Sequence, residues 1–180
     1  MPTVAIATDA DLDAIAALVN SAYRGDSSRA GWTTEADYLE GQRTDAERLR
    51  EELGRTPGAV LLTLRDDDSS LLGSVWLEPR GADVWYLGMF TIRPDLQARG
   101  LGRVLLGECE RFARSRGARR MRISVIQLRA SLIEWYERRG FRATGETVPF
   151  PYGDERNGIP LRNDLQLLVF EKPLDTTSNG

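Results

Sequence analysis

The stretch VWYLGMFTIRPDLQARGLGRVLLGECERFARSRG, residues Val84–Gly117, changes its hydrophobic period at Pro94. Apolar and aromatic residues dominate up to Ile92, as they do in a buried β-strand. After Pro94 the apolar residues recur at helical spacing on one face: Leu101, Val104, Leu105, Cys109, Phe112 and Ala113. The stretch therefore predicts a strand, a glycine-containing turn and an amphipathic helix over residues 100–116. Since Met121–Ile126 follows as a further strand, the two strands are expected to be parallel.

Other apolar runs and helical patterns complete the expected order of elements. Strands are expected at Val4–Ala7, Val60–Arg65, Leu71–Glu78 and Leu165–Lys172, and helices at Leu12–Tyr23, Thr44–Leu53 and Ser131–Arg139. Thr44 and Glu47 have the spacing of a capping box, and Gly140 is expected to close the last helix. Residues 24–43 predict a long irregular connection. Short turns between consecutive strands favour an antiparallel meander, so the sheet of this mixed α/β fold should itself be mixed.

The composition excludes several kinds of chemistry. The chain contains no histidine and one cysteine, Cys109, which rules out a serine–histidine triad, a histidine-based zinc site and an internal disulfide. Cys109 falls on the apolar helix face and is interpreted as core packing. The carboxylate run Asp66–Asp68 lies between two strands and has the composition of a turn, so no metal site is predicted.

The length and the ends of the chain favour one compact domain over residues 1–174. A chain of 180 residues with 41% hydrophobic content can bury one sizeable core, and the polar end, 175–180, is expected to be a flexible tail. No run of 18 apolar residues occurs, and the N-terminus lacks the pattern of a signal peptide. We therefore expect a cytoplasmic protein that does not bind membranes.

The net charge of −3 gives no electrostatic footprint for nucleic acid, but the charge is unevenly distributed. Residues 99–142 contain 12 arginines and 4 glutamates, so this segment is strongly basic and the remainder is acidic. Arginine-rich helix faces in solvent and an anion-binding site both explain such a segment.

The turn Gln97-Ala98-Arg99-Gly100-Leu101-Gly102 opens this basic segment, between a strand and the start of a helix. Unpaired backbone N–H groups and the positive end of the helix dipole favour an anion there, and glycines allow it to approach closely. Arg99 and Arg103 add positive charge. A tight strand-to-helix turn alone would also explain the two glycines.

Two separated motifs resemble the GCN5-related N-acetyltransferase (GNAT) family. They are Met89–Pro94 followed by Gln97-x-x-Gly100-x-Gly102, and the helix segment WYERRGF at Trp135–Phe141. The similarity extends in element order from Val4 to about Lys172. The resemblance implies a mostly antiparallel sheet of about six to seven strands flanked by about four helices. It also implies an enzyme that transfers acetyl from acetyl-CoA to a primary amine, in a small molecule or peptide, by direct attack in a ternary complex.

The resemblance implies where the cofactor lies. The strand end Phe90, Thr91 and Ile92 would offer backbone N–H groups to pantetheine, and one near Phe90 could polarise the thioester carbonyl. The pyrophosphate would bind to Gln97, Ala98, Arg99, Gly100, Leu101, Gly102 and Arg103. Relatives often place asparagine where this chain has Arg129, which departs from the pattern and could reach a cofactor phosphate instead.

The resemblance also implies catalytic groups. Tyr136 matches the family's tyrosine beside the CoA sulfur and is expected to protonate the departing thiolate; packing on the helix's apolar face is the alternative. Relatives often have a carboxylate base on the strand Val84–Phe90, which lacks one here. Glu78, at the end of the preceding strand, is the nearest candidate base, and it could equally be a solvated strand end. Tyr86 with a water chain is another candidate.

By family analogy, the acceptor would be recognised by the first inter-helix segment and by residues 149–155. The first segment offers Tyr23, Trp32, Glu35 and Tyr38. Aromatic and acidic side chains suit a small cationic amine, and acidic loops also serve solubility. The sequence is compatible with both a monomer and a homodimer. A non-catalytic acyl-CoA sensor is an alternative function, and the missing carboxylate of the strand Val84–Phe90 favours it. A Rossmann-type nucleotide binder is disfavoured, because it needs an acidic residue where this chain has Arg119–Arg122.

Overall fold

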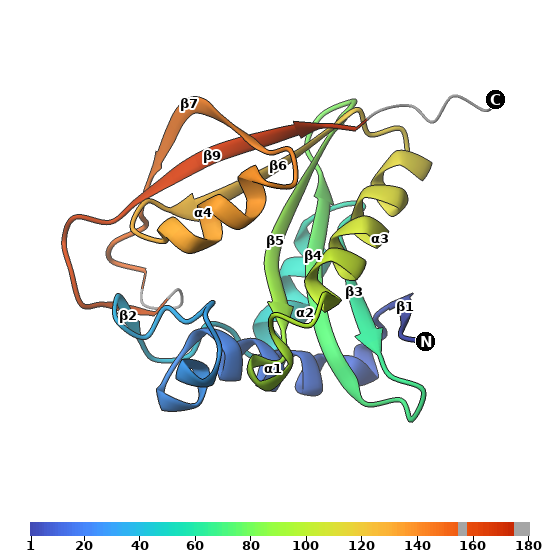
Figure 1. Ribbon diagram of the computed structural model, residues 1–180, viewed down its shortest axis with the longest axis horizontal. Coiled ribbons are helices and arrows are strands. Elements are labelled where there is room, and N and C mark those ends of the chain that lie inside the picture. The colour runs from blue at the N-terminus through green and yellow to red at the C-terminus, as the bar shows by residue number, and fades with distance from the viewer. Residues whose placement is uncertain (155–157, 175–180) are drawn as a thin grey trace.

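The computed structural model describes residues 1–154 and 158–174, and it is built around a seven-stranded sheet in the order β1-β3-β4-β5-β6-β9-β7 (Figure 1). The strands are β1 (Thr3–Ile6), β3 (Val60–Arg65), β4 (Leu71–Pro79), β5 (Val84–Ile92), β6 (Arg120–Ile126), β7 (Arg142–Pro149) and β9 (Gln166–Pro173). β5 and β6 are parallel, and every other neighbouring pair in this sheet is antiparallel. The expected mixed sheet and its parallel strand pair are therefore confirmed. The expected tail at 175–180 lies outside the described residues.

Helices cover both faces of the sheet. They are α1 (Leu12–Tyr23), α2 (Ala46–Arg55), α3 (Leu101–Ser115) and α4 (Ala130–Glu137), with short 3-10 turns η1 (Asp9–Asp11), η2 (Asp26–Ala30) and η3 (Pro94–Leu96). Figure 1 shows α3 and α4 in front of the strands and α2 behind them. Within the described residues, no helix is long and apolar enough to cross a membrane.

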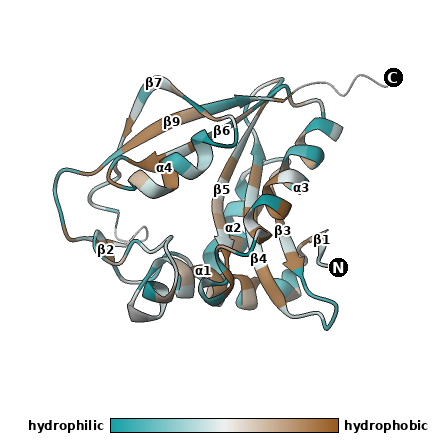
Figure 2. Ribbon diagram, in the orientation of Figure 1, coloured by the Kyte–Doolittle hydropathy of each residue, from teal (hydrophilic) through white to brown (hydrophobic). Residues whose placement is uncertain are grey.

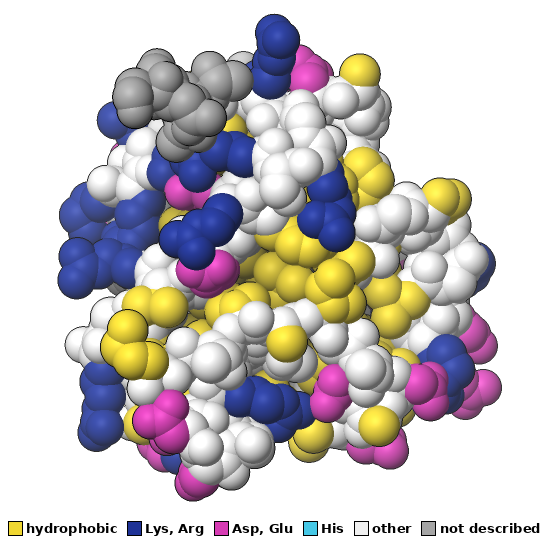
Figure 3. Space-filling model, turned by 90° about the vertical axis from the view of Figure 1, so that its right-hand side faces the viewer, with side chains coloured by type: hydrophobic (Ala, Val, Ile, Leu, Met, Phe, Trp, Pro, Cys, Tyr) yellow, Lys and Arg dark blue, Asp and Glu magenta, His cyan; other side chains and the backbone are white. Residues whose placement is uncertain are grey.

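The central strands are apolar on both faces because both faces are covered. Leu61 and Trp76 pack with residues of α1 and α2, whereas Leu62 and Val75 pack with residues of α3 in a second cluster. Successive side chains of a strand point to opposite faces, which accounts for this division. Figure 2 shows the result as hydrophobic colour along the strands and hydrophilic colour on the outer sides of the helices. On the face in Figure 3, apolar side chains form a central patch surrounded by charged ones.

The structure corrects the sequence expectations at three places. α2 is capped by Asp45, whose side chain accepts a 2.8 Å hydrogen bond from the backbone N–H of Arg48, and not by Thr44. The edge strand β7 was not expected, because all of its residues are exposed and its sequence lacks an apolar alternation. A small sheet of β2 (Leu39–Glu40) and β8 (Ile159–Pro160) also ties the long connection after α1 to the chain before β9.

Candidate functional site

The parallel strands β5 and β6 separate in the middle of the sheet. Their pairing covers only Val84–Tyr86 with Arg120–Arg122, although β5 continues to Ile92 and β6 to Ile126. The backbone groups of β5 that face β6 beyond Tyr86 therefore have no partner in that strand. This opening is visible between β5 and β6 in Figure 1, with α3 on one side and α4 on the other.

A β-bulge shapes β5 at the same place. Met89 has a positive φ of 46°, and the register between β4 and β5 shifts opposite Val75. The hydroxyl of Thr91 donates a 3.0 Å hydrogen bond to the Met89 carbonyl, and the hydroxyl of Tyr23 donates to the Phe90 carbonyl. A strained residue held by such contacts often marks a functional site, because a bulge changes the direction of the backbone groups around it.

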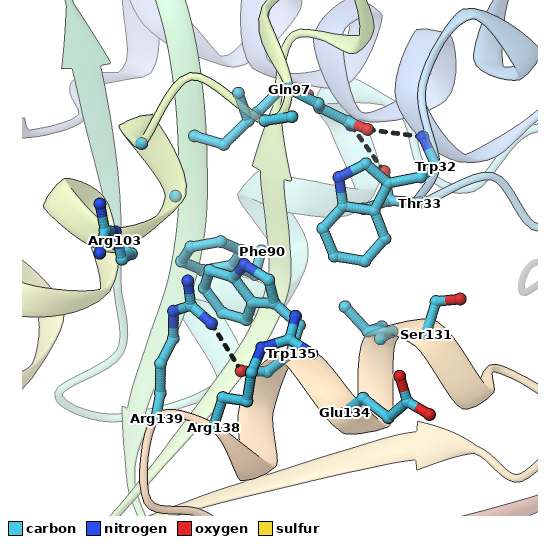
Figure 4. Close-up of a pocket in the computed structure, with 15 residues that line it drawn as sticks. Trp32, Thr33, Phe90, Gln97, Arg103, Ser131, Glu134, Trp135, Arg138 and Arg139 are labelled. Carbon is cyan, nitrogen blue, oxygen red and sulfur yellow. Dashed lines mark hydrogen bonds between the residues drawn. The ribbon is translucent and has the colours of Figure 1, made fainter.

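A first cavity of about 590 Å³ lies between the start of α3 and one side of α4 (Figure 4). It is lined by Trp32, Thr33, Phe90, Ile92, Gln97, Ala98, Gly100, Gly102, Arg103, Ser131, Leu132, Glu134, Trp135, Arg138 and Arg139. The aromatic rings form one wall: the Trp135 centroid lies 5.7 Å from that of Phe90 and 6.4 Å from that of Trp32. The cavity is therefore apolar on one side and cationic near α3.

The two glycines of the turn have different reasons to be glycine. Gly100 is the N-cap of α3 and has a φ of 83°, a conformation that costs other residues free energy. At Gly102, an added Cβ would lie 3.1 Å from the Trp135 ring, so close packing requires the missing side chain. Gly100 gives α3 no side-chain cap, which leaves the N–H groups of the first turn available to an anion in the cavity.

Three arginines, Arg103, Arg138 and Arg139, line the cavity close to this helix start. No ion pair of theirs is found among the described residues, and the Nε of Arg139 is buried without a hydrogen-bond partner. Burial lowers the pKa of Arg139, and the charges of Arg103 and Arg138 lower it further. An anion bound between these guanidinium groups would relieve that repulsion. Arg138 and Arg139 were not expected from the sequence, although they belong to the basic segment.

Gln97 joins this turn to the long connection after α1. Its side-chain oxygen accepts a 2.8 Å hydrogen bond from the backbone N–H of Trp32. Its amide nitrogen donates to the Thr33 hydroxyl at 2.7 Å and to the Ile92 carbonyl at 3.1 Å. Gln97 therefore holds the wall of the cavity together, and its side chain is occupied by the protein.

Gly31→Ala is expected to lower the free energy of unfolding by about 1–3 kcal/mol, the usual cost of an overpacked site. Its φ of −114° suits alanine, but the new Cβ would lie 2.3 Å from the Gln97 side-chain oxygen. The measurement is denaturant unfolding. Gly54→Ala, where nothing lies within 4 Å of the new Cβ, is the matched control and should not destabilise. In a Gln97→Ala background the cost should vanish, and a cost that persists there would refute this role of Gln97.

A second, smaller cavity of about 180 Å³ lies on the other side of Phe90 and Leu132, which line both cavities. Its polar lining comes from α1, the long connection, β5, β6 and α4: Tyr23, Arg24, Glu35, Arg43, Tyr86, Ser124, Arg129 and Tyr136. The hydroxyls of Tyr86 and Ser124 are hydrogen-bonded at 2.9 Å. The two cavities therefore meet at the opening between β5 and β6.

Tyr136 is the buried tyrosine of this junction. Its ring packs edge-on against Phe90, Trp135 and Phe141, and the residue is 4% exposed. Burial raises the pKa of Tyr136 well above its usual value, so its hydroxyl stays protonated. Among the described residues this hydroxyl has no hydrogen-bond partner, which leaves it free to donate to a bound group.

Glu35 is buried between two arginines in the second cavity. Its carboxylate lies 3.3 Å from Arg24 and 3.3 Å from Arg129. Arg129 also donates to the Thr33 carbonyl and lies 5.5 Å above the Tyr23 ring. Arg129 therefore lines the second cavity, whereas the sequence suggested that an arginine at this position, a departure from the family pattern, could reach a cofactor phosphate.

The other predicted residues divide between the cavities and their surroundings. The first cavity is lined by Phe90, Ile92, Gln97, Ala98, Gly100, Gly102 and Arg103, whereas Thr91, Arg99 and Leu101 line neither cavity. Trp32, expected near the acceptor, lines the first cavity, and Tyr23 and Glu35 line the second.

Two predicted site residues lie outside both cavities. Tyr38 donates its hydroxyl to the Leu128 carbonyl at 3.4 Å and packs in a separate small core. Glu78 pairs with Arg80 at 2.6 Å, and the Arg80 guanidinium lies 3.8 Å from the centre of the Tyr86 ring. Glu78 therefore lies beside Tyr86, which lines the second cavity, but lines neither cavity itself. Glu155, at the end of the predicted acceptor loop, is outside the described residues.

Comparison with known proteins is consistent with this geometry. Residues 15–141 match the sequence model of a family described as the acetyltransferase (GNAT) family. The chain is 34% identical over 110 residues to a mycothiol acetyltransferase of Beutenbergia cavernae, an alignment that covers 59% of this chain and 36% of that protein. The chain thus spans about a third of that relative's length.

Solved structures share the fold. The ribosomal-protein-S18-alanine N-acetyltransferase of Escherichia coli superposes with a TM-score of 0.70 at 17% identity, covering 100% of this chain and 98% of that one. A GNAT family acetyltransferase of Elizabethkingia anophelis with acetyl-CoA bound gives a TM-score of 0.64 at 16% identity, covering 96% and 98%. At these identities the similarity concerns the fold alone.

Proposed function

This chain belongs to the acetyltransferase (GNAT) family, and we propose that it transfers acetyl from acetyl-CoA to a primary amine by direct attack in a ternary complex. The observation that carries the proposal is that two cavities of different character meet at Phe90 and Leu132. We also propose that residues 1–174 act as one domain, since one sheet runs from β1 to β7.

The first cavity fits the phosphates and pantetheine of coenzyme A. The uncapped start of α3, the close packing at Gly102 and three arginines without an ion pair among the described residues, Arg103, Arg138 and Arg139, suit a diphosphate. The aromatic wall suits a thin apolar chain. When bound, acetyl-CoA supplies the acetyl group as a reactive thioester. Backbone N–H groups of β5 near Phe90 would polarise its carbonyl, because β6 does not pair with them.

Tyr136 is proposed to donate its proton to the departing thiolate. Its hydroxyl is protonated, unpartnered among the described residues and at the junction of the two cavities. Direct attack is supported by the state of Cys109, the only thiol of the chain. Burial raises the pKa of Cys109, so this residue is unsuited to carry an acetyl intermediate.

The proton of the attacking amine needs a different acceptor from Glu78. Because Glu78 is paired with Arg80 outside both cavities, we assign proton transfer to the hydrogen-bonded hydroxyls of Tyr86 and Ser124, which line the second cavity and would relay the proton to solvent water as its final acceptor. Because Glu35, the carboxylate in the described lining of this cavity, is paired with two arginines, the rate should depend on the fraction of acceptor that is already deprotonated.

The experiment is release of free thiol from acetyl-CoA in the presence of a panel of primary amines. The name of the Beutenbergia relative adds acceptors related to mycothiol to that panel. We expect amine-dependent release with intersecting initial-velocity lines, as a ternary complex requires. Tight binding of CoA with no release above the amine-free background would instead identify a sensor. Parallel lines would contradict direct attack.

A further inference from the structure

The second cavity carries more arginine than carboxylate. Among the described residues that line it, the arginines are Arg24, Arg43 and Arg129, and Glu35 is the one carboxylate. This composition does not match the cationic acceptor that the acidic residues of the first inter-helix segment suggested. An amine that enters this cavity meets an excess of positive charge.

Two of the three arginines are already engaged by the protein. Arg24 and Arg129 are 5% and 9% exposed in their side chains, and both contact the Glu35 carboxylate at 3.3 Å. Arg24 makes further polar contacts, one of them to the Gln42 carbonyl at 3.4 Å. These two arginines therefore hold Glu35 in place, and its single carboxylate balances one of their two positive charges.

Arg43 differs from them, because its backbone is fixed and its guanidinium is not engaged. Asn20 of α1 accepts hydrogen bonds from the backbone N–H groups of Arg43 at 2.7 Å and Thr44 at 3.1 Å, and donates to the Thr44 carbonyl at 2.9 Å. Within the described ranges 1–154 and 158–174, the half-buried Arg43 guanidinium has no hydrogen bond or ion pair. Burial lowers the pKa of Arg24, and the charge of Arg43 lowers it further, so the Arg43 charge acts inside this cavity.

We propose that the acceptor is a small amine that also carries an anionic group, a carboxylate or a phosphonate, and that Arg43 binds this group. The inference rests on the proposed function, because it takes the second cavity as the acceptor site. Arginine is suited to the role, since its planar guanidinium offers paired donors to such an anion. A volume of about 180 Å³ suits an acceptor of roughly the size of an amino acid.

The test uses matched acceptors that differ only in the anion: an L-amino acid, its carboxamide, the amine without the carboxylate, and the corresponding aminophosphonate. The readout is kcat/KM for each acceptor in wild-type protein and in Arg43→Gln. Comparing the acid-to-amide ratio between proteins cancels the intrinsic reactivity of each amine. The phosphonate shows which of the two anions Arg43 prefers.

Wild-type protein should prefer the acid, and Arg43→Gln should lower the acid-to-amide ratio by about 10- to 100-fold, as expected for a lost hydrogen-bonded charge pair. Arg43→Lys should retain part of the preference. Arg55→Gln is the charge-matched control, because Arg55 is exposed on α2 and lines neither cavity. An acid-to-amide ratio that is the same in wild type and Arg43→Gln would overturn the inference.

A binding measurement separates this inference from the proposed function. Calorimetric titration of the amino acid into CoA-saturated protein does not require turnover. If no amine is acetylated but the amino acid binds in an Arg43-dependent manner, acetyl transfer is refuted and the anion site is supported. If there is neither turnover nor binding, both are refuted.

Discussion

Gly102→Glu should raise the KM for acetyl-CoA by about 100-fold. The new carboxylate would lie beside the pyrophosphate of the cofactor, and bringing two like charges together costs several kcal/mol. The new side chain would start 3.1 Å from the Trp135 ring and project into the first cavity, at the unpaired N–H groups of α3. Its carboxylate would compete with a diphosphate for Arg103 and Arg139. Steady-state kinetics at varied acetyl-CoA, together with CoA binding by calorimetry, measure the change.

Gly107→Glu is the matched control for this substitution. It adds the same charge to the same helix at an exposed position where nothing lies within 4 Å of the new Cβ. We expect a near wild-type KM for acetyl-CoA in this variant, and circular dichroism should show that both variants are folded. Equal cofactor affinity in Gly102→Glu and Gly107→Glu would remove the turn at residues 97–102 from the cofactor site.

Tyr136→Phe should lower kcat by about 100-fold, within the range that general acids contribute. The same change should leave the free energy of unfolding unchanged or slightly higher. The ring contacts with Phe90, Trp135 and Phe141 are kept, and the lost hydroxyl has no hydrogen-bond partner among the described residues. Because the substitution removes no hydrogen bond among the described residues, a large loss of activity at unchanged stability would indicate a catalytic role of the hydroxyl.

Three measurements distinguish an acid role of Tyr136 from a packing role. An acetyl thioester of a more acidic thiol should restore much of the lost rate, because that thiolate leaves without a proton donor. In wild-type protein the hydroxyl should remain a donor up to about pH 10 and beyond, since burial raises the pKa of Tyr136. Tyr38→Phe, a tyrosine outside both cavities, is the control and should keep full activity. Failure of the acidic thiol to rescue Tyr136→Phe would refute the acid role.

The parts of the fold that were predictable from sequence are those with a local signature. The strand–turn–helix of Val84–Gly117 is such a case, since the change from strand to helical period lies within a single stretch. β7 has no such signature, because its side chains are exposed and it pairs with β9 alone in the sheet of the described residues. A strand with no buried side chains does not need alternating apolar residues, so a search for that alternation misses it.

The site was predictable only where a motif fixes the backbone. Gly102 lines the first cavity and Tyr136 the second, and the motifs predict the turn and the helix that carry them. The surroundings of Glu78 and Arg129 depend on side chains far away in sequence: Arg129 turns to Glu35, 94 residues away. Arg43 became a candidate only when the structure showed that its neighbours Arg24 and Arg129 already share a carboxylate and that it does not.

The short pairing of β5 with β6 has a consequence for the motions of the sheet. Three residue pairs are all that join the β1-β3-β4-β5 half to the β6-β9-β7 half within this ladder, whereas β6 and β9 are paired over seven. The short ladder between β5 and β6 is therefore where the two halves of the sheet would separate first. Amide protons of β5 beyond Tyr86 that face β6 should exchange with solvent faster than those in the ladder between β6 and β9. A ligand that spans both cavities would contact both halves of the sheet and hold them together. Its binding should therefore slow amide exchange in both halves.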